Sequence, residues 1–250
     1  MTQLKSIYSK ALRLGIKTAG FLLLLSVLQI ALLRFPDALF GWSVSYANLA
    51  LHSDQSFESD AGREILELVE SRLISSSLYD AEQEHAIFIS NAEWRQRLLF
   101  SHVYGVGGVN YYPASSNVFL AGALIEENRL ISPSGRIVEE PRSLDYFAAH
   151  EITHTLLKQA AGIIAHATLP EYVREGLPDY IAMGGKYSYE KMLEDFLSES
   201  RKMDRQRTGL YYRYHFLVAH LLEKELWSER ELLSNPPDQS GLEERIRSSQ

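Results

Sequence analysis

The chain contains a short run of metal-ligating side chains, His150-Glu151-Ile152-Thr153-His154, and a further carboxylate, Glu175, 21 positions after His154 (175 − 154). In a helix, residues four positions apart lie on one face. Two imidazoles at that spacing can bind one metal ion, while the glutamate beside the first holds and deprotonates a water molecule. A catalytic zinc site usually takes three protein ligands and leaves one position for water. Glu175 can supply the third ligand, and the combination predicts a zinc hydrolase.

The residues around this motif favour a helix. Ser143 is placed to be its N-cap, and Asp145 falls in the first turn, where a carboxylate interacts favourably with the helix dipole. A stripe of apolar residues at helical spacing continues through the motif at Leu144, Phe147, Ala148, Ile152 and Leu156. The alternative is a buried structural helix with two hydrogen-bonded histidines and a solvated glutamate.

These residues resemble the gluzincins, the thermolysin-like clan of zinc metallopeptidases. The similarity is closest to small families that read H-E-x-x-H and then P-x-W-x-x-E-G-x-A-x-Y. The second block stands here as Pro170-Glu171-Tyr172-Val173-Arg174-Glu175-Gly176-Leu177-Pro178-Asp179-Tyr180. The resemblance covers about forty residues. It implies a zincin-like domain in which Glu151 is the catalytic acid/base, Asp179 orients a ligand histidine, and Zn²⁺ is bound by His150, His154 and Glu175.

The second block departs from the family pattern at two positions. Tyr172 stands in place of tryptophan, which keeps a bulky aromatic side chain. Pro178 stands in place of alanine, and a proline inside a helix removes a hydrogen bond and clashes with the preceding turn. The sequence therefore predicts that this helix either begins close to Gly176 or is kinked at Pro178.

A further group is needed to donate a hydrogen bond to the oxyanion of a tetrahedral intermediate. The resemblance places a tyrosine or histidine for this role on a helix after the third ligand, and the run Tyr211-Tyr212-Arg213-Tyr214-His215 offers candidates. We expect the donor to be Tyr211, Tyr212 or His215, with Tyr212 and His215 as the assigned catalytic candidates. The alternative is that this helix face simply packs into the core. His166, in the connection 162–169, is expected to be a structural histidine.

The N-terminal region predicts a membrane anchor. Residues 18–33 are uncharged and mostly apolar, and as a helix they would span about 24 Å. Basic residues precede the segment at Lys5, Lys10, Arg13 and Lys17, whereas acidic residues follow it at Asp37, Asp54, Glu58 and Asp60. The positive-inside rule then predicts a cytosolic segment 1–17, a signal anchor 18–35 and an extracytoplasmic remainder. A cleaved signal peptide is the alternative, but no cleavage site follows closely.

The composition excludes some classes of function. The net charge is −7, and lysine and arginine form no dense stripe outside the N-terminus, so nucleic-acid binding is not indicated. Cysteine is absent, so metal binding has to use histidine and carboxylate ligands. About two hundred residues follow the anchor, which is enough for one well-buried core.

The chain reads as an α+β protein. We expect a juxtamembrane segment 36–56, a zincin-like catalytic domain 57–234 and a mobile tail 235–250. Helices are predicted at 61–78, 93–100, 190–200 and 211–226, and strands at 86–90, 109–112 and 117–120. In zincins an edge strand beside the motif helix pairs with the substrate, and by resemblance residues 117–121 are the candidate. Asn117 and Phe119 are therefore the expected substrate-binding residues, with an interior strand as the alternative.

Two functions remain from the sequence. The first is a membrane-anchored zinc metallopeptidase that hydrolyses peptides or proteins at the extracytoplasmic face, with a non-peptide amide such as a cell-wall linkage still open. The second is a zincin-like envelope domain used for binding or scaffolding without turnover. The presence of all three ligand types and of a glutamate base favours the enzyme.

Overall fold

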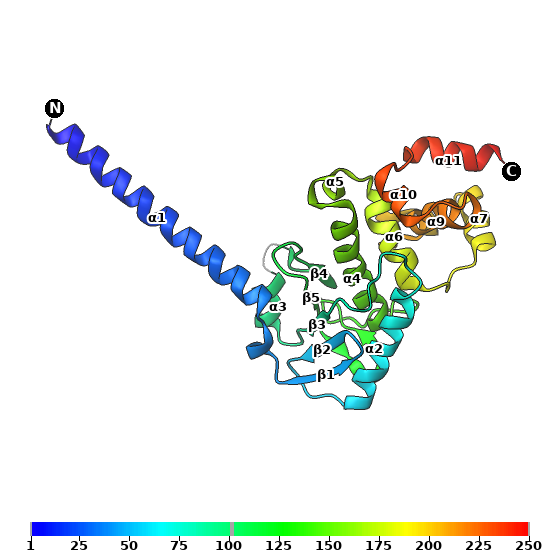
Figure 1. The fold of residues 1–250 in the computed structure, drawn as a ribbon, viewed down its shortest axis with the longest axis horizontal. Coiled ribbons are helices and arrows are strands. Elements are labelled where there is room, and N and C mark those ends of the chain that lie inside the picture. Colours follow the sequence, from blue (N-terminus) through cyan, green and yellow to red (C-terminus); the bar gives the residue numbers. More distant parts are fainter. Residues whose placement is uncertain (1, 101–102, 250) are drawn as a thin grey trace.

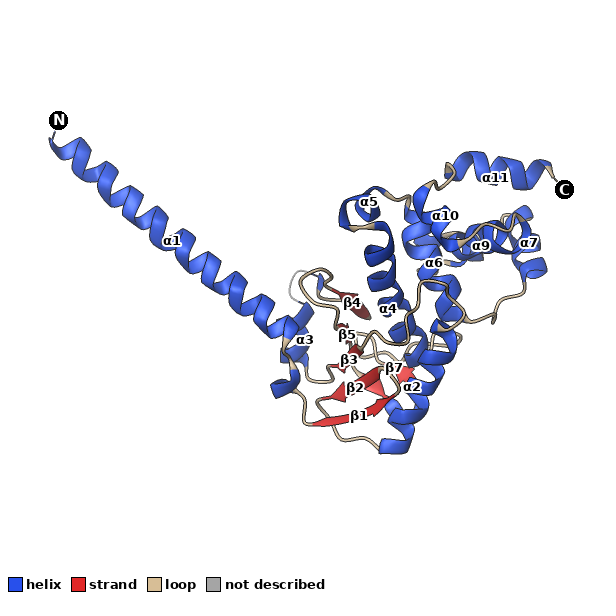
Figure 2. Ribbon diagram, viewed as in Figure 1, coloured by secondary structure: helices blue, strands red, loops and turns tan. Residues whose placement is uncertain are grey.

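The computed structural model describes residues 2–100 and 103–249, with residues 2–14 described as helical backbone only. A long helix, α1 (Thr2–Arg34), projects from a mixed α+β domain (Figure 1). In that domain the motif helix α4 (Leu144–Ala161) lies between a small sheet and a group of C-terminal helices (Figure 2). The expected α+β class is confirmed.

The main sheet has five strands in the order β1-β2-β3-β5-β4. Its strands are β1 (Trp42–Tyr46), β2 (Leu49–Ser53), β3 (His85–Ile89), β4 (Gly108–Asn110) and β5 (Val118–Leu120). The pairs β2–β3 and β3–β5 are parallel, whereas β1–β2 and β4–β5 are antiparallel. Two short strands, β6 (Ala123–Leu124) and β7 (Arg129–Leu130), form a separate hairpin.

The expected substrate strand is an interior strand. β5 is paired on both sides, and the Phe119 side chain is fully buried. The Asn117 side chain donates a hydrogen bond to the Leu33 carbonyl oxygen (2.9 Å) on the far side of the sheet from the motif helix. The assignment of Asn117 and Phe119 to substrate binding is therefore wrong. β4 occupies the edge because it folds back against β5 in an antiparallel pair.

The helices cover the sheet and build the second half of the domain. α2 (Ser59–Leu73) and α4 pack on one sheet face, and α3 (Glu93–Phe100) packs on the other. The remaining helices are α5 (Ile163–Thr168), α6 (Glu171–Met183), α7 (Tyr189–Leu197), α8 (Arg205–Thr208), α9 (Tyr212–Ala219), α10 (Glu229–Ser234) and α11 (Gln239–Ser248). A π-helical turn, His220–Lys224, extends α9, and short 3₁₀ turns lie at Asp37–Leu39, Ile125–Glu127 and Arg201–Met203.

Two expected segment boundaries are wrong. Residues 36–56 contain β1 and β2, so this stretch is part of the sheet rather than a juxtamembrane linker. Residues 239–248 form α11 rather than a mobile tail. Leu242 and Ile246 of this helix are fully buried, and Glu243 pairs with Arg213. The segment is mostly polar, so the sequence did not indicate a packed helix. Leu242 and Ile246, one turn apart, are apolar and are enough to hold a surface helix in place.

The helix α1 is apolar enough to span a membrane. Its segment Gly15–Arg34 has a mean hydropathy of 2.0, and almost none of it is covered by the domain. The side chains of Lys5, Lys10 and Arg13 lie outside the described residues. At its last turn, Leu33 is buried in a small second core with Phe88 and Phe119. The helix is thus joined to the sheet directly.

A buried cation connects the three helices that surround the motif. Arg72 of α2 pairs with Asp145 in the first turn of α4 and donates to the carbonyl oxygen of Ala182 near the end of α6. Asp145 also accepts hydrogen bonds from Ser143 and Asn128. Burial alone would raise the pKa of Asp145, but the Arg72 charge and these hydrogen bonds lower it. The network fixes α4 and α6 relative to α2.

Replacing Arg72 should destabilise the whole domain. In Arg72→Met the Asp145 carboxylate and the Ala182 carbonyl would remain buried without their partner, which is expected to cost about 3–5 kcal/mol of unfolding free energy. Arg63→Met is the matched control, because Arg63 lies on the same helix in an exposed pair with Glu67 and should change stability by less than about 1 kcal/mol. Chemical denaturation of both variants measures the difference, and equal effects would contradict the role of Arg72.

Candidate metal centre

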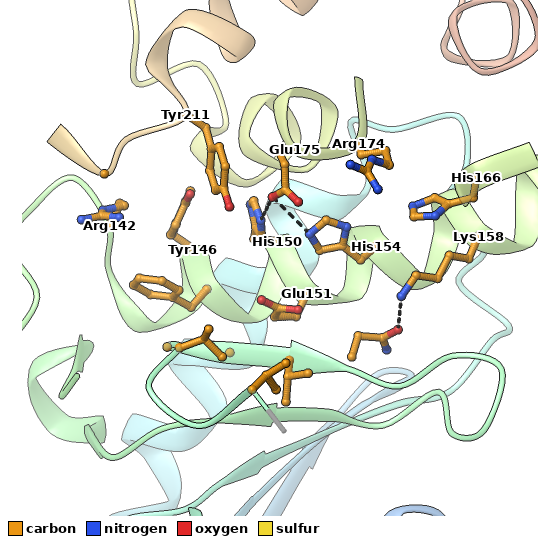
Figure 3. Close-up of a pocket in the computed structure, with 18 residues that line it drawn as sticks. Arg142, Tyr146, His150, Glu151, His154, Lys158, His166, Arg174, Glu175 and Tyr211 are labelled. Carbon is orange, nitrogen blue, oxygen red and sulfur yellow. Dashed lines mark hydrogen bonds and ion pairs between the residues drawn. The ribbon is translucent and has the colours of Figure 1, made fainter. Parts of the chain in front are cut away.

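The motif helix presents both histidines and Glu151 to one pocket. α4 begins at Leu144 with Ser143 as its N-cap residue, as expected, although the Ser143 hydroxyl donates to Asp145 rather than capping the backbone. Ile152 and Leu156 are buried against the sheet and α2 side. This packing turns the opposite face of α4, with His150, Glu151 and His154, toward a pocket of about 420 Å³ (Figure 3).

The second helix brings Glu175 to the two histidines. Glu175 Oε2 lies 3.8 Å from His150 Nε2 and 3.7 Å from His154 Nε2. One ligand atom from each of the three residues falls within 4.8 Å of the others, and the group could hold a metal ion. Tetrahedral ligands about 2.1 Å from a zinc ion are about 3.4 Å apart. The two distances from Glu175 to the histidines exceed this spacing by only a few tenths of an ångström.

The electrostatic environment favours the ligand forms of two of these groups. Burial and the nearby His150 charge lower the pKa of His154 to about 3, so its imidazole is neutral. Burial would raise the pKa of Glu175, but hydrogen bonds from His150 and Tyr211 and the histidine charges lower it to about 2. Neutral imidazole and ionised carboxylate are the states that bind a metal, so little proton release is needed at these two positions.

Pro178 does not break the helix that carries Glu175. α6 runs from Glu171 to Met183 with Pro178 in its interior, so it begins well before Gly176. A Cβ at Gly176 would lie 2.6 Å from the Tyr214 carbonyl oxygen, which shows how closely α6 and α9 approach. This packing holds the helix where the proline removes a hydrogen bond.

Glu151 lies between the three ligands and the edge strand. Burial raises the pKa of Glu151 to about 7, with His150 lowering it and Glu175 raising it. A divalent cation bound nearby would lower this value. A Cβ at Gly108 of β4 would lie 2.8 Å from Glu151 Cγ, so the strand can approach the carboxylate only because residue 108 is glycine. A water molecule held by Glu151 would thus lie beside both the ligands and the strand.

The structure places Tyr211, and not Tyr212 or His215, in the pocket. The Tyr211 ring stacks on His150 with centroids 5.7 Å apart, and the Tyr211 hydroxyl donates to Glu175. Tyr212 instead donates to Asp195 (3.1 Å), and His215 donates to Asp179 (2.9 Å), with both rings buried away from the pocket. The assignment of Tyr212 and His215 is wrong because α9 begins at Tyr212 and turns these side chains toward the helical core.

Asp179 does not hydrogen bond to a ligand histidine. Its two carboxylate oxygens accept from Tyr146 (2.6 Å) and His215 (2.9 Å). Within the described residues, His150 Nδ1 is buried and has no hydrogen-bond partner. The expected role of Asp179 is therefore corrected: it fixes Tyr146, whose ring lies 5.6 Å from that of His150, and so it acts on the ligand through packing.

Four basic residues line the pocket that were not assigned to the site from the sequence. Arg142 lies at one end, whereas Lys158, His166 and Arg174 lie at the other, next to His154 (Figure 3). His166 was set aside because it has no ligand-spaced partner, and the segment around it forms α5 rather than an irregular connection. Burial and the charges of Lys158 and Arg174 lower the pKa of His166 to about 4. The i+4 spacing of Lys158 from His154 was the one available signal.

Metal analysis tests the three-residue centre. The full-length protein should bind about one divalent metal ion per chain, and His154→Ala and Glu175→Ala should each lose it. Glu171→Ala is the matched control, since Glu171 also lies on α6 but pairs with Arg205 and Tyr214 outside the group. Metal content by mass spectrometry, together with a fold check by circular dichroism, gives the comparison. Metal retained in Glu175→Ala but lost in Glu171→Ala would identify a different third ligand.

No protein-family model matches this chain, and no curated protein is detectably similar to it. α4 and α6 bring His150, His154 and Glu175 together, and Glu151 and Tyr211 lie in the same pocket. The site is a candidate metal centre with a carboxylate and a phenol beside it.

Proposed function

We propose that the protein is a membrane-anchored, zinc-dependent metallopeptidase that cleaves peptide bonds on the extracytoplasmic side of a membrane. The observation that carries this proposal is the position of Glu151 in the same pocket as the His150–His154–Glu175 group. A structural metal site needs no additional carboxylate, and its ligands usually fill the coordination shell. Three ligands with a free carboxylate beside them are typical of hydrolytic sites.

The ligand set favours zinc. Two imidazoles and one carboxylate suit a four-coordinate ion with one open position, whereas Ca²⁺ and Mg²⁺ prefer six or more oxygen ligands or octahedral geometry. When bound, zinc supplies Lewis acidity to a carbonyl group and lowers the pKa of a coordinated water molecule. The three side chains of this protein would position it, and the neutral form of His154 supports such binding.

Glu151 provides the proton transfers of the proposed reaction. As a carboxylate it accepts a proton from the attacking water molecule, and as a carboxylic acid it donates that proton to the leaving amine. Burial raises the pKa of Glu151 and so favours uptake of the proton, whereas a cation bound nearby would lower this pKa and favour its release. The proton balance closes because one proton is taken from water and the same proton is returned to the amine.

Tyr211 is the proposed donor to the oxyanion. Burial and the neighbouring Glu175 carboxylate raise the pKa of Tyr211 strongly, so the phenol remains protonated and able to donate. The Tyr211 ring stacks on His150, and the Arg205 guanidinium lies over the Tyr211 ring, 4.6 Å from its centroid. A donor held in this way needs little reorganisation as negative charge develops.

The edge strand β4 offers a place for the substrate backbone. Gly107, Gly108, Val109 and Asn110 line the pocket, and β4 is paired on one side only, with β5. An extended peptide can add to such an edge through main-chain hydrogen bonds. The scissile bond would then lie in the pocket, beside Glu151 and the His150–His154–Glu175 group.

The proposed location follows from the charges on either side of α1. Lys5, Lys10, Arg13 and Lys17 precede the apolar segment, and acidic residues follow it. The positive-inside rule places the N-terminus in the cytosol and the domain on the opposite side. Because Leu33 is part of a core, the whole chain, rather than residues 36–250, is the correct material for experiments.

The variant Glu151→Gln tests the proposed base. Removing the carboxylate should lower kcat/KM on a peptide library by about 10²–10⁴-fold while zinc stays bound, because Glu151 is not one of the three ligands. Zinc content and hydrolysis are measured on the same preparation. Unchanged hydrolysis would refute the role of Glu151. No turnover in the zinc-loaded wild type would instead favour an envelope domain for binding or scaffolding.

The pair Tyr211→Phe and Tyr212→Phe tests the oxyanion donor. Loss of the Tyr211 hydroxyl should lower kcat by about 10–10³-fold with little change in KM, because the hydrogen bond is made in the transition state. Tyr212→Phe is a matched control, since that hydroxyl binds Asp195 outside the pocket. Comparable losses of kcat in the two variants would show that the effect comes from the fold rather than from a donor.

A further inference from the structure

One end of the pocket gathers basic side chains from three helices. Lys158 lies one turn beyond His154 on α4, Arg174 immediately precedes Glu175 on α6, and His166 comes from α5. All three line the pocket and lie on the His154 side of the metal centre (Figure 3). None of the three belongs to the group that could hold the metal ion.

These side chains lack anionic partners. Among the described residues, neither Lys158 nor Arg174 forms an ion pair, and Lys158 Nζ contacts only the neutral Asn110 amide oxygen at 3.4 Å. Arg174 Nε and His166 Nε2 are buried and have no hydrogen-bond partner in the described part of the chain. Partly buried arginines elsewhere do pair with carboxylates, as Arg72, Arg95, Arg205 and Arg213 show. Lys158 and Arg174 differ from these arginines because no carboxylate pairs with them among the described residues.

Such an arrangement is unfavourable unless a ligand completes it. Like charges beside buried, unpaired nitrogen atoms cost free energy, and donors of this kind are normally satisfied. Among the residues that the structure describes, the carboxylates that line the pocket near Lys158 are Glu151 and Glu175, which are already assigned as the base and as a metal ligand. A metal ion would add further positive charge. A molecule that carries a negative charge into the pocket would give Lys158 and Arg174 a partner of their own.

We propose that Lys158 and Arg174, with His166, form a subsite that binds a carboxylate group of the substrate next to the scissile bond. The inference rests on the proposed peptidase function and narrows its substrates to peptides that carry a negative charge at this position. The carboxylate could be an aspartate or glutamate side chain or the C-terminal carboxylate, and both would receive charge-assisted hydrogen bonds from the two cations. Arg142, at the opposite end of the pocket, is not part of this subsite.

The test uses acetylated alanine hexapeptides with one glutamate at each position in turn, each matched by a glutamine peptide. Every peptide is made with a free or an amidated C-terminus. The zinc-loaded, full-length protein in a non-ionic detergent should cleave one glutamate or free-carboxylate peptide about tenfold to a hundredfold better than its uncharged match. The position and the terminus that give the preference identify which carboxylate is bound.

Four variants locate the effect. Lys158→Gln and Arg174→Gln should each lose most of the charge preference, whereas Arg174→Lys should keep it because the positive charge remains. Arg142→Gln should also keep the preference, since Arg142 lies at the other end of the pocket. A loss of preference in Arg142→Gln equal to that in Arg174→Gln would overturn the subsite in favour of general pocket charge.

Binding measurements separate this subsite from the peptidase reaction. Fluorescently labelled versions of the same peptides are titrated against the Glu151→Gln protein, and binding is followed by anisotropy. Tighter binding of the charged peptide, lost in Glu151→Gln/Arg174→Gln, supports the subsite even if the wild type shows no hydrolysis. Hydrolysis and binding that are equal for charged and uncharged peptides would overturn the subsite while leaving the peptidase proposal intact.

Discussion

The buried contact of Arg72 with Asp145 and Ala182 is the constraint on which the rest of the structure depends. One guanidinium of α2 reaches the first turn of α4 and the last part of α6, which are the two helices that carry the metal-ligating residues. A shift of either helix along the other would move Glu175 away from the two imidazoles. Asp145 is fully buried, so such a shift would also leave its carboxylate in the interior without Arg72 as a partner. The relative position of the helices is therefore strongly determined.

The packing that fixes the helices also sets the chemistry of the pocket. α6 and α9 are in close contact at Gly176, and β4 and Glu151 are in close contact at Gly108, so the ionisable groups lie among packed helices and a strand. Burial then keeps His154 neutral and moves the pKa of Glu151 toward neutrality, while hydrogen bonds keep Glu175 ionised. Three ionisable groups within one small site thus acquire three different protonation behaviours, as metal ligands and a proton-transfer group require.

The sequence predicted the two histidines of the candidate metal group well because their spacing lies within one helix, whereas the approach of Glu175 depends on how α6 packs against α4. The i, i+4 spacing fixes two imidazoles on one helix face, and the helix at 93–100 and the strand at 85–89 follow from clear apolar patterns. Features that depend on tertiary packing were not predictable in this way. The choice of Tyr211 over Tyr212 depends on where α9 begins, and the edge position of β4 depends on chain reversal. Helix α11 depends on two buried side chains in a polar segment.

The junction of α1 with the domain determines where the pocket can operate. Leu33 is packed beneath Phe88 and Phe119, and its carbonyl oxygen accepts a hydrogen bond from Asn117, so no slack chain separates the helix from the sheet. An enzyme on a long flexible stalk sweeps a hemisphere of positions above a bilayer. With α1 inserted in a bilayer, the domain could not rotate freely about the end of the helix. Its pocket would stay at a fixed height above the bilayer and in a fixed orientation. Molecules that reach the pocket would then have to lie at a particular distance from the lipid surface.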